Sequence, residues 1–167
     1  MSDPESLRRL NALEADVRIL KTKEVPRSGI TAQVYNNANL SIANNTVTAL
    51  TMNSERSDTD GMHSTSVNTS RLTCVTPGTY IITGNAAFAS NATGIRVLSI
   101  RANGTTDLAK VDSDAVATDV TVLSVSKVVT LGVGEYVELT VYQNSGGNLN
   151  VQANTNYSPE FTAARIA

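Results

Sequence analysis

Hydroxyl, carboxylate and imidazole side chains crowd into one short segment, residues 54–64, which reads Ser-Glu-Arg-Ser-Asp-Thr-Asp-Gly-Met-His-Ser. It contains His63, the only histidine of the chain. A serine nucleophile, a histidine base and an acid that orients the base would together make a hydrolytic centre. Such groups usually converge from separate elements, and the sequence has neither a Gly-x-Ser-x-Gly turn nor a second histidine. A carbohydrate-acting enzyme centred on Ser54 to Ser64 is therefore only the third hypothesis considered.

The same segment contains Asp58-x-Asp60-Gly61, which is similar to the start of a calcium-binding loop. The glutamate that closes an EF-hand loop is missing, and no flanking helices are predicted. The alternative is a solvated turn capped by the aspartate side chains. His63 is then a hydrogen-bonded loop residue, because zinc would need several further nitrogen or sulfur donors. Calcium at Asp58 and Asp60 is the one cofactor that the sequence leaves open, and otherwise none is expected.

Charge and glycine patterns argue against nucleic acid or nucleotide phosphates as partners. The net charge is −2, so the chain lacks the broad basic field that holds phosphate backbones. Gly132-x-Gly134 lacks the lysine and the strand-to-helix context of a phosphate-binding loop. Four dispersed arginines are not interleaved with aromatic residues and are interpreted as solvated or pairing side chains: Arg56, Arg71, Arg96 and Arg101.

Membrane insertion and secretion are not expected either. No apolar run approaches the roughly 20 residues that span a bilayer, and no apolar segment of a signal peptide follows Met1. The chain is therefore expected to be made in the cytoplasm. Cys74 is the only cysteine, which excludes an intrachain disulfide, and we interpret it as an inert core residue.

Residues 1–24 are predicted to form the only helix, an N-terminal stem. Ser2 and Glu5 have capping-box spacing, and Pro4 suits the first turn. Apolar residues follow the a/d rhythm of a coiled coil: Leu10, Leu13, Val17 and Leu20. About two heptads are too few to hold an oligomer alone. The stripe is therefore expected to orient and attach associated copies; the alternative, packing on the chain's own β domain, is opposed by the linker at residues 25–29.

Residues 30–167 are predicted to form one antiparallel β domain of about eight to ten strands. Val137, Leu139 and Val141 alternate with polar positions, so one face of that strand should be buried. Asn103-Gly104 suits a type I′ turn and Pro77-Gly78 a type II turn. The predicted strands are 30–35, 47–52, 71–75, 79–89, 95–102, 109–111, 120–131, 136–143, 148–153 and 161–166.

The order and spacing of several motifs resemble the trimeric jelly roll shared by tumour necrosis factor and the globular heads of the first complement component. The resemblance covers residues 29–167 and is carried by residues 75–80, 100–104, 129–139 and 161–166. Within them the matching positions are Pro77, Gly78, Tyr80, Asn103, Gly104, Gly134 and Phe161. The resemblance implies an antiparallel jelly-roll sandwich, a homotrimer and a C-terminal strand near the trimer axis.

Two further stretches, residues 58–64 and 142–147, resemble the version of this fold found in bacteria and their tailed phages. Cytokine-type or complement-type function is not carried over, because the chain has no collagen-like stem. The first hypothesis is a non-enzymatic phage virion protein on the particle surface. Its N-terminal helix would bind other virion proteins, and its jelly-roll knob would contact a glycan or protein on the host cell. The rival hypothesis is a trimeric capsid-decorating protein, or head fibre.

Overall fold

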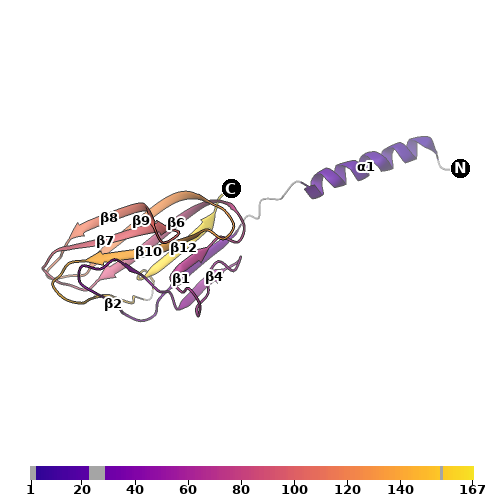
Figure 1. Ribbon diagram of the computed structural model, residues 1–167. Helices are drawn as coiled ribbons and strands as arrows, with labels where there is room; N and C mark the ends of the chain where they lie inside the picture. Colours follow the sequence, from indigo (N-terminus) through magenta and orange to yellow (C-terminus); the bar gives the residue numbers. More distant parts are fainter. Residues whose placement is uncertain (1–2, 23–28, 155) are drawn as a thin grey trace.

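The N-terminal helix α1 spans Pro4–Thr22. The carboxylate of Asp3, just before it, accepts the backbone N–H of Glu5 at 3.2 Å and the Ser6 hydroxyl at 3.2 Å. Asp3 is thus the capping residue, whereas the predicted cap, Ser2, lies outside the described residues. The computed structural model describes residues 3–22, 29–154 and 156–167, without the side chains of residues 7 and 15–22 (Figure 1). None of the described helices is long and apolar enough to cross a membrane.

Twelve strands of two to eleven residues follow in the described part of the chain, in two antiparallel sheets. The larger sheet runs β4-β1-β12-β6-β9, with β11 and β2 continuing from β6 (Figure 1). Its strands are β1 (Thr31–Tyr35), β2 (Leu40–Ile42), β4 (Ser54–Asp58), β6 (Gly78–Phe88), β9 (Thr121–Leu131), β11 (Leu149–Val151) and β12 (Glu160–Arg165). The smaller sheet contains β3 (Thr48–Ala49), β5 (Arg71–Thr73), β7 (Ile95–Ala102), β8 (Thr106–Asp114) and β10 (Tyr136–Gln143).

This architecture confirms the predicted antiparallel jelly-roll sandwich preceded by a short helix. The strands predicted at 95–102 and 136–143 have the observed bounds. The estimate of eight to ten strands was too low, because β2 and β4 were not predicted. β4 contains no apolar residue, and β2 is only three residues long, so neither gives a periodic hydrophobic signal.

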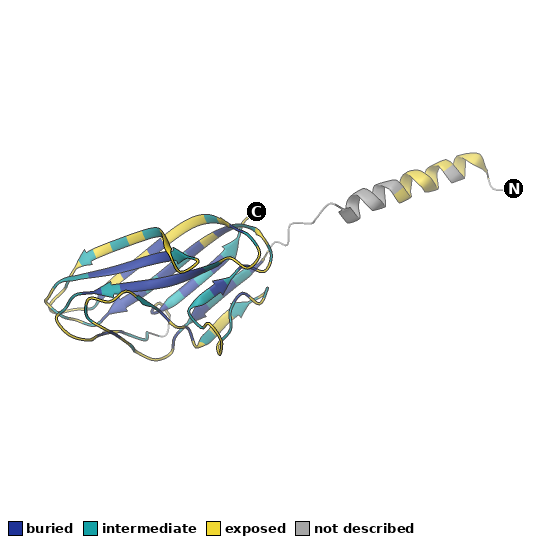
Figure 2. Ribbon diagram, in the orientation of Figure 1, coloured by how far each residue is buried: buried dark blue, intermediate teal, exposed yellow. Residues whose placement is uncertain are grey.

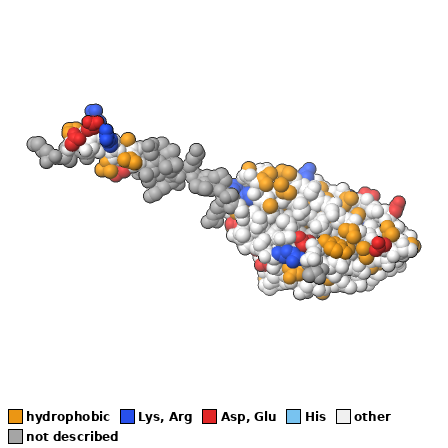
Figure 3. All heavy atoms as spheres, turned by 180° about the vertical axis from the view of Figure 1, so that it is seen from behind, with side chains coloured by type: hydrophobic (Ala, Val, Ile, Leu, Met, Phe, Trp, Pro, Cys, Tyr) orange, Lys and Arg blue, Asp and Glu red, His pale blue; other side chains and the backbone are white. Residues whose placement is uncertain are grey.

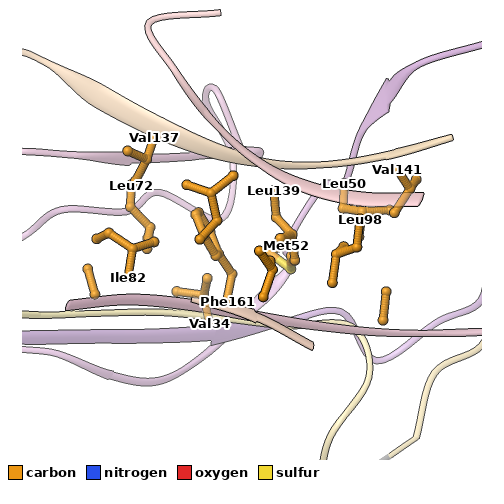
Figure 4. Close-up of a cluster of buried hydrophobic side chains, with 14 of the residues drawn as sticks. Val34, Leu50, Met52, Leu72, Ile82, Leu98, Val137, Leu139, Val141 and Phe161 are labelled. Atoms are coloured by element: carbon orange, nitrogen blue, oxygen red, sulfur yellow. The ribbon is translucent and has the colours of Figure 1, made fainter. Parts of the chain in front are cut away.

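The core lies between the two sheets, and Figure 4 shows Val34, Ile82 and Phe161 facing Leu72, Val137 and Leu139 across it. Burial alternates with exposure over residues 121–126 of β9, as expected of a strand with one face on the core (Figure 2). Gly84 allows close packing here, because a Cβ atom at this position would lie 2.3 Å from Cδ1 of Leu139.

The two predicted turns have different outcomes. Asn103 and Gly104 have φ angles of 49° and 72°, and the Thr105 N–H donates to the Ala102 carbonyl at 3.1 Å, which is type I′ geometry. Pro77-Gly78 is not a type II turn, because Gly78 does not adopt the positive φ that this turn requires and instead begins β6. Gly78 is needed for another reason, since a Cβ there would lie 2.3 Å from the Ala167 carbonyl oxygen.

Candidate functional site

The outer face of the larger sheet is the most extensive candidate surface, and it is built by strand alternation. Along β1, β12, β6 and β9, core residues alternate with residues on the opposite face, although Ala87 of that face is itself buried at the end of β6. Backbone pairing aligns these outward residues in rows across the strands. We call the following set the outer face: Thr31, Gln33, Tyr35, Thr79, Ile81, Thr83, Asn85, Val122, Ser124, Ser126, Val128, Thr130, Glu160, Thr162 and Ala164.

Charge on the outer face is confined to one ion pair. Glu160 is the only ionisable acid or base in the set besides the Tyr35 phenol, and its carboxylate lies 3.3 Å from Nε of Arg56 on the neighbouring β4. The Gln33 amide donates to the same carboxylate, and the Arg56 guanidinium lies 4.5 Å from the Tyr35 ring centroid. The rest of the face is formed by small uncharged side chains, a composition poor in charge like the centre of protein interfaces.

Three β-branched apolar side chains of the outer face are exposed to solvent. Ile81 and Val128 are cross-strand neighbours with exposed fractions of 38% and 55%, and Val122 is exposed farther along β9. Figure 3, which views the molecule from behind, shows hydrophobic side chains gathered in separate places on a largely uncharged surface. Burial of these side chains in an assembly would stabilise it through the hydrophobic effect.

The helix presents a second apolar stripe, of which only part is described. Leu10 and Leu13 are exposed by 53% and 61%. The side chains of Val17 and Leu20, the other predicted stem positions, lie outside the described residues, as does most of the predicted linker. Among the described residues, these two leucines are thus left largely uncovered.

The segment at residues 54–64 does not assemble a catalytic triad in the structure. Its first part is the edge strand β4, and the His63 ring is buried between two acceptors. Nδ1 lies 2.8 Å from Oε1 of Glu55, and Nε2 lies 3.2 Å from the Thr69 carbonyl oxygen. The serine hydroxyls bind elsewhere: Ser54 to Asn53, Ser57 to Thr31 and Ser64 to Ser66. His63 therefore serves as a hydrogen-bonded loop residue.

The two calcium candidates hold the same loop in place through hydrogen bonds. The Asp58 carboxylate accepts the N–H groups of Asp60, Met62 and His63 at 3.2, 3.1 and 2.9 Å. Asp60 accepts the N–H and hydroxyl of Thr76 at 3.0 and 3.2 Å. Within residues 3–22, 29–154 and 156–167, no three histidine, cysteine, aspartate or glutamate side chains group closely enough to hold a metal. The carboxylates of Asp58 and Asp60 thus cap this turn through hydrogen bonds, and calcium binding at them stays a prediction.

One arginine differs from the prediction that all four are solvated or pairing. Arg71 pairs with Glu138 and Arg101 with Asp107, at 3.3 and 2.8 Å. Arg96 is fully buried, forms no ion pair among the described residues, and donates to the carbonyl groups of residues 91, 93 and 95. Burial lowers the pKa of its guanidinium. The prediction was wrong for Arg96 because its three carbonyl partners lie in the preceding loop and at the strand's first residue, and sequence alone does not place them.

The remaining motif residues maintain the fold. Tyr80 is buried at the start of β6, and its hydroxyl donates to the Thr76 carbonyl. Burial raises its pKa to about 12 and also raises the pKa of the neighbouring Cys74 thiol. Gly134 has a φ of 83° in the turn before β10, and Phe161 lies in the core (Figure 4). These positions organise the scaffold of the outer face.

Solved structures with the same fold are jelly rolls of the tumour necrosis factor and complement C1q type. The globular domain of zebrafish complement 1qA protein matches with a TM-score of 0.59 and 18% identity, over 82% of this chain and 97% of its own. Murine APRIL matches with a TM-score of 0.57 and 11% identity, over 81% of this chain and 98% of its own. Eiger TNF from S. frugiperda matches with a TM-score of 0.60 and 9% identity, over 84% of this chain and 94% of its own. No family model and no curated protein matches the sequence.

Proposed function

We propose that the chain is a non-enzymatic, homotrimeric virion knob of a tailed phage, attached to the particle through its N-terminal helix. The observation that carries the proposal is the outer face of the larger sheet. That face is poor in charge, its one ion pair is satisfied within the chain, and Ile81, Val122 and Val128 stand exposed on it. A closed trimer would bury one such face of each subunit against two neighbours.

Attachment through the helix is supported by its exposed apolar residues. Leu10 and Leu13 are uncovered in the single chain, and an amphipathic stripe gains stability only when a partner covers it. In a trimer, three helices would be able to cover one another and dock together on a larger assembly.

The virion part of the proposal is supported by the phage-like stretches at residues 58–64 and 142–147. A knob in this position would contact a glycan or protein of the host surface. The capsid-decorating alternative uses the same trimer and the same helix, and differs only in its location on the particle.

The test is to find the chain on purified phage particles that encode it. Gold-labelled antibodies against the knob, followed by cryo-electron microscopy, should show three-fold density projecting from a tail tip or fibre. Density on the capsid would instead establish the decorating role. Absence of the chain from purified particles by mass spectrometry would refute both virion roles.

A further inference from the structure

A hollow of about 210 Å³ lies on the smaller sheet, on the opposite layer of the sandwich from the outer face. It follows one row of paired strands, because Lys110 of β8 pairs with Ser99 of β7, and Ser99 pairs with Thr140 of β10. Tyr142 and Val97 form the next row, and Val47 borders the hollow before β3. It is smaller than the range of about 300–1,000 Å³ that holds drug-sized ligands, which limits the ligand to a single small unit.

The floor of the hollow offers unused hydroxyl groups. Ser99 and Thr140 are only 5% and 3% exposed. Within the part of the chain that the structure describes, neither hydroxyl has a hydrogen-bond partner, and neither oxygen is sealed off from the hollow. Each hydroxyl can donate one hydrogen bond and accept up to two, so the floor suits a ligand that carries hydroxyl groups.

The walls are apolar and the aromatic wall is held in place. The hydroxyl of Tyr142 donates to Oδ1 of Asn45 at 3.0 Å, which fixes the orientation of the ring. Val47 and Val97 provide the aliphatic surface beside it. Rings that have both a C–H face and hydroxyl edges, as sugars do, match a site with an apolar wall and a hydroxyl floor.

The residues that line the hollow carry a net charge of plus one, and the exposed Asp112, which is paired with Val97, lies just outside this lining. Nε of Arg101 lies 2.8 Å from Oδ1 of Asp107, so that these two charges compensate each other. Lys110 is exposed and has no ion pair among the described residues. One uncompensated ammonium group favours a ligand that carries one anionic group, because charge-assisted hydrogen bonds are the stronger ones.

We propose that this hollow binds an acidic monosaccharide unit, a sugar ring with one carboxylate. The carboxylate would face Lys110, the ring hydroxyls would bind Ser99 and Thr140, and a C–H face would lie against Tyr142 and the valines. This inference rests on the host-binding part of the proposed function and names its ligand class. The sugar would then bind to the smaller sheet, which the proposed trimer leaves uncovered.

Titration of the full chain with methyl glucuronide, followed through backbone amide resonances, tests the inference. The amide resonances of β7, β8 and β10 should shift in a saturable manner. Methyl glucoside, which lacks the carboxylate, should bind at least about tenfold more weakly than the glucuronide. Lys110→Gln and Thr140→Val should each weaken glucuronide binding about tenfold. Lys127→Gln, which removes an exposed lysine from β9 of the other sheet, should leave it unchanged.

Several outcomes would overturn the inference. The first is the absence of saturable shifts, and the second is equal affinity for the glucuronide and the glucoside. The third is equal affinity of the Lys110→Gln and Lys127→Gln variants for the glucuronide. The fourth is equal affinity for the glucuronide and N-acetylglutamate, which would indicate that the hollow binds a peptide carboxylate. The amide spectrum of each variant reports whether it is folded. Sedimentation of the same samples separates the two proposals: a trimer without binding refutes the sugar site alone, and a binding monomer refutes the trimer alone.

Discussion

Replacing both Ile81 and Val128 by threonine should weaken the trimer without unfolding the subunit. The two residues face each other across β6 and β9, and 38% and 55% of their surfaces are exposed in the single chain. Full burial of such a side chain is worth about 1.5–3 kcal/mol, so burial of these exposed fractions contributes roughly 1.5–3 kcal/mol per subunit. Threonine keeps the β-branched shape but replaces a methyl group of Val128 and the ethyl group of Ile81 by a hydroxyl. We expect the double substitution to weaken the free energy of trimer association by about 3–6 kcal/mol.

Sedimentation velocity over a dilution series measures this effect directly. The overall trimer dissociation constant should rise by about a hundredfold or more, and the thermal unfolding midpoint of the variant should fall on dilution at concentrations where the wild type is unaffected. Val133→Thr is the matched control, because Val133 is 71% exposed in the β9–β10 turn and lies outside the outer face. Equal dissociation constants for Ile81→Thr/Val128→Thr and the wild type would refute the use of this face.

Four further perturbations test the scaffold. Gly84→Ala forces a Cβ against Leu139 and should destabilise the fold by about 1–3 kcal/mol, measured by urea unfolding. An unchanged unfolding midpoint would contradict the close packing of Gly84 on Leu139. Burial raises the pKa of Tyr80 from its ordinary 10 to about 12, so its contribution to stability is complete below pH 10 and is lost between pH 10 and 12. The wild type should therefore lose about 2–3 kcal/mol across that window relative to Tyr80→Phe, and parallel pH profiles would contradict this. Asp58→Asn should lower the free energy of unfolding by about 1–3 kcal/mol, because the amide cannot accept three N–H groups as the carboxylate does. The unfolding midpoint of the wild type should be the same in calcium and in chelator. A midpoint that calcium raises would support a metal site at Asp58 and Asp60. Arg96→Lys should cost about 1–3 kcal/mol in the same assay, because an ammonium lacks the planar fork that reaches three carbonyls, and a neutral result would contradict that role.

Sequence reasoning was most successful where one strand carries both a hydrophobic alternation and a turn signal. β7 ends at the Asn103-Gly104 turn and β10 alternates Val137, Leu139 and Val141, and both were predicted with their observed bounds. It failed for β4, which is an edge strand of polar and charged residues paired only to β1. Such a strand is fixed by backbone hydrogen bonds to its neighbour rather than by a buried face, so its own residues carry no signal.

The candidate sites show the same limit more strongly. The outer face consists of single residues from strands that are distant in sequence, such as Thr31, Ala164, Ile81 and Val128, and only the strand order aligns them. The pairing of Arg56 with Glu160 joins residues more than a hundred positions apart. Conversely, the crowded segment at residues 54–64 attracts chemical interpretation, yet its Asp58 carboxylate accepts the N–H groups of its own turn. Proximity in sequence brought Glu55 and His63 together but did not bring a serine hydroxyl to the His63 ring.

Sedimentation equilibrium of the wild-type chain at micromolar concentration shows whether the chain is a trimer. We expect a single species of three times the chain mass of 17.6 kDa. That species should revert toward the single-chain mass in the Ile81→Thr/Val128→Thr variant. A wild-type species of 17.6 kDa across the whole concentration range would contradict the trimer, and with it the proposed role of the outer face.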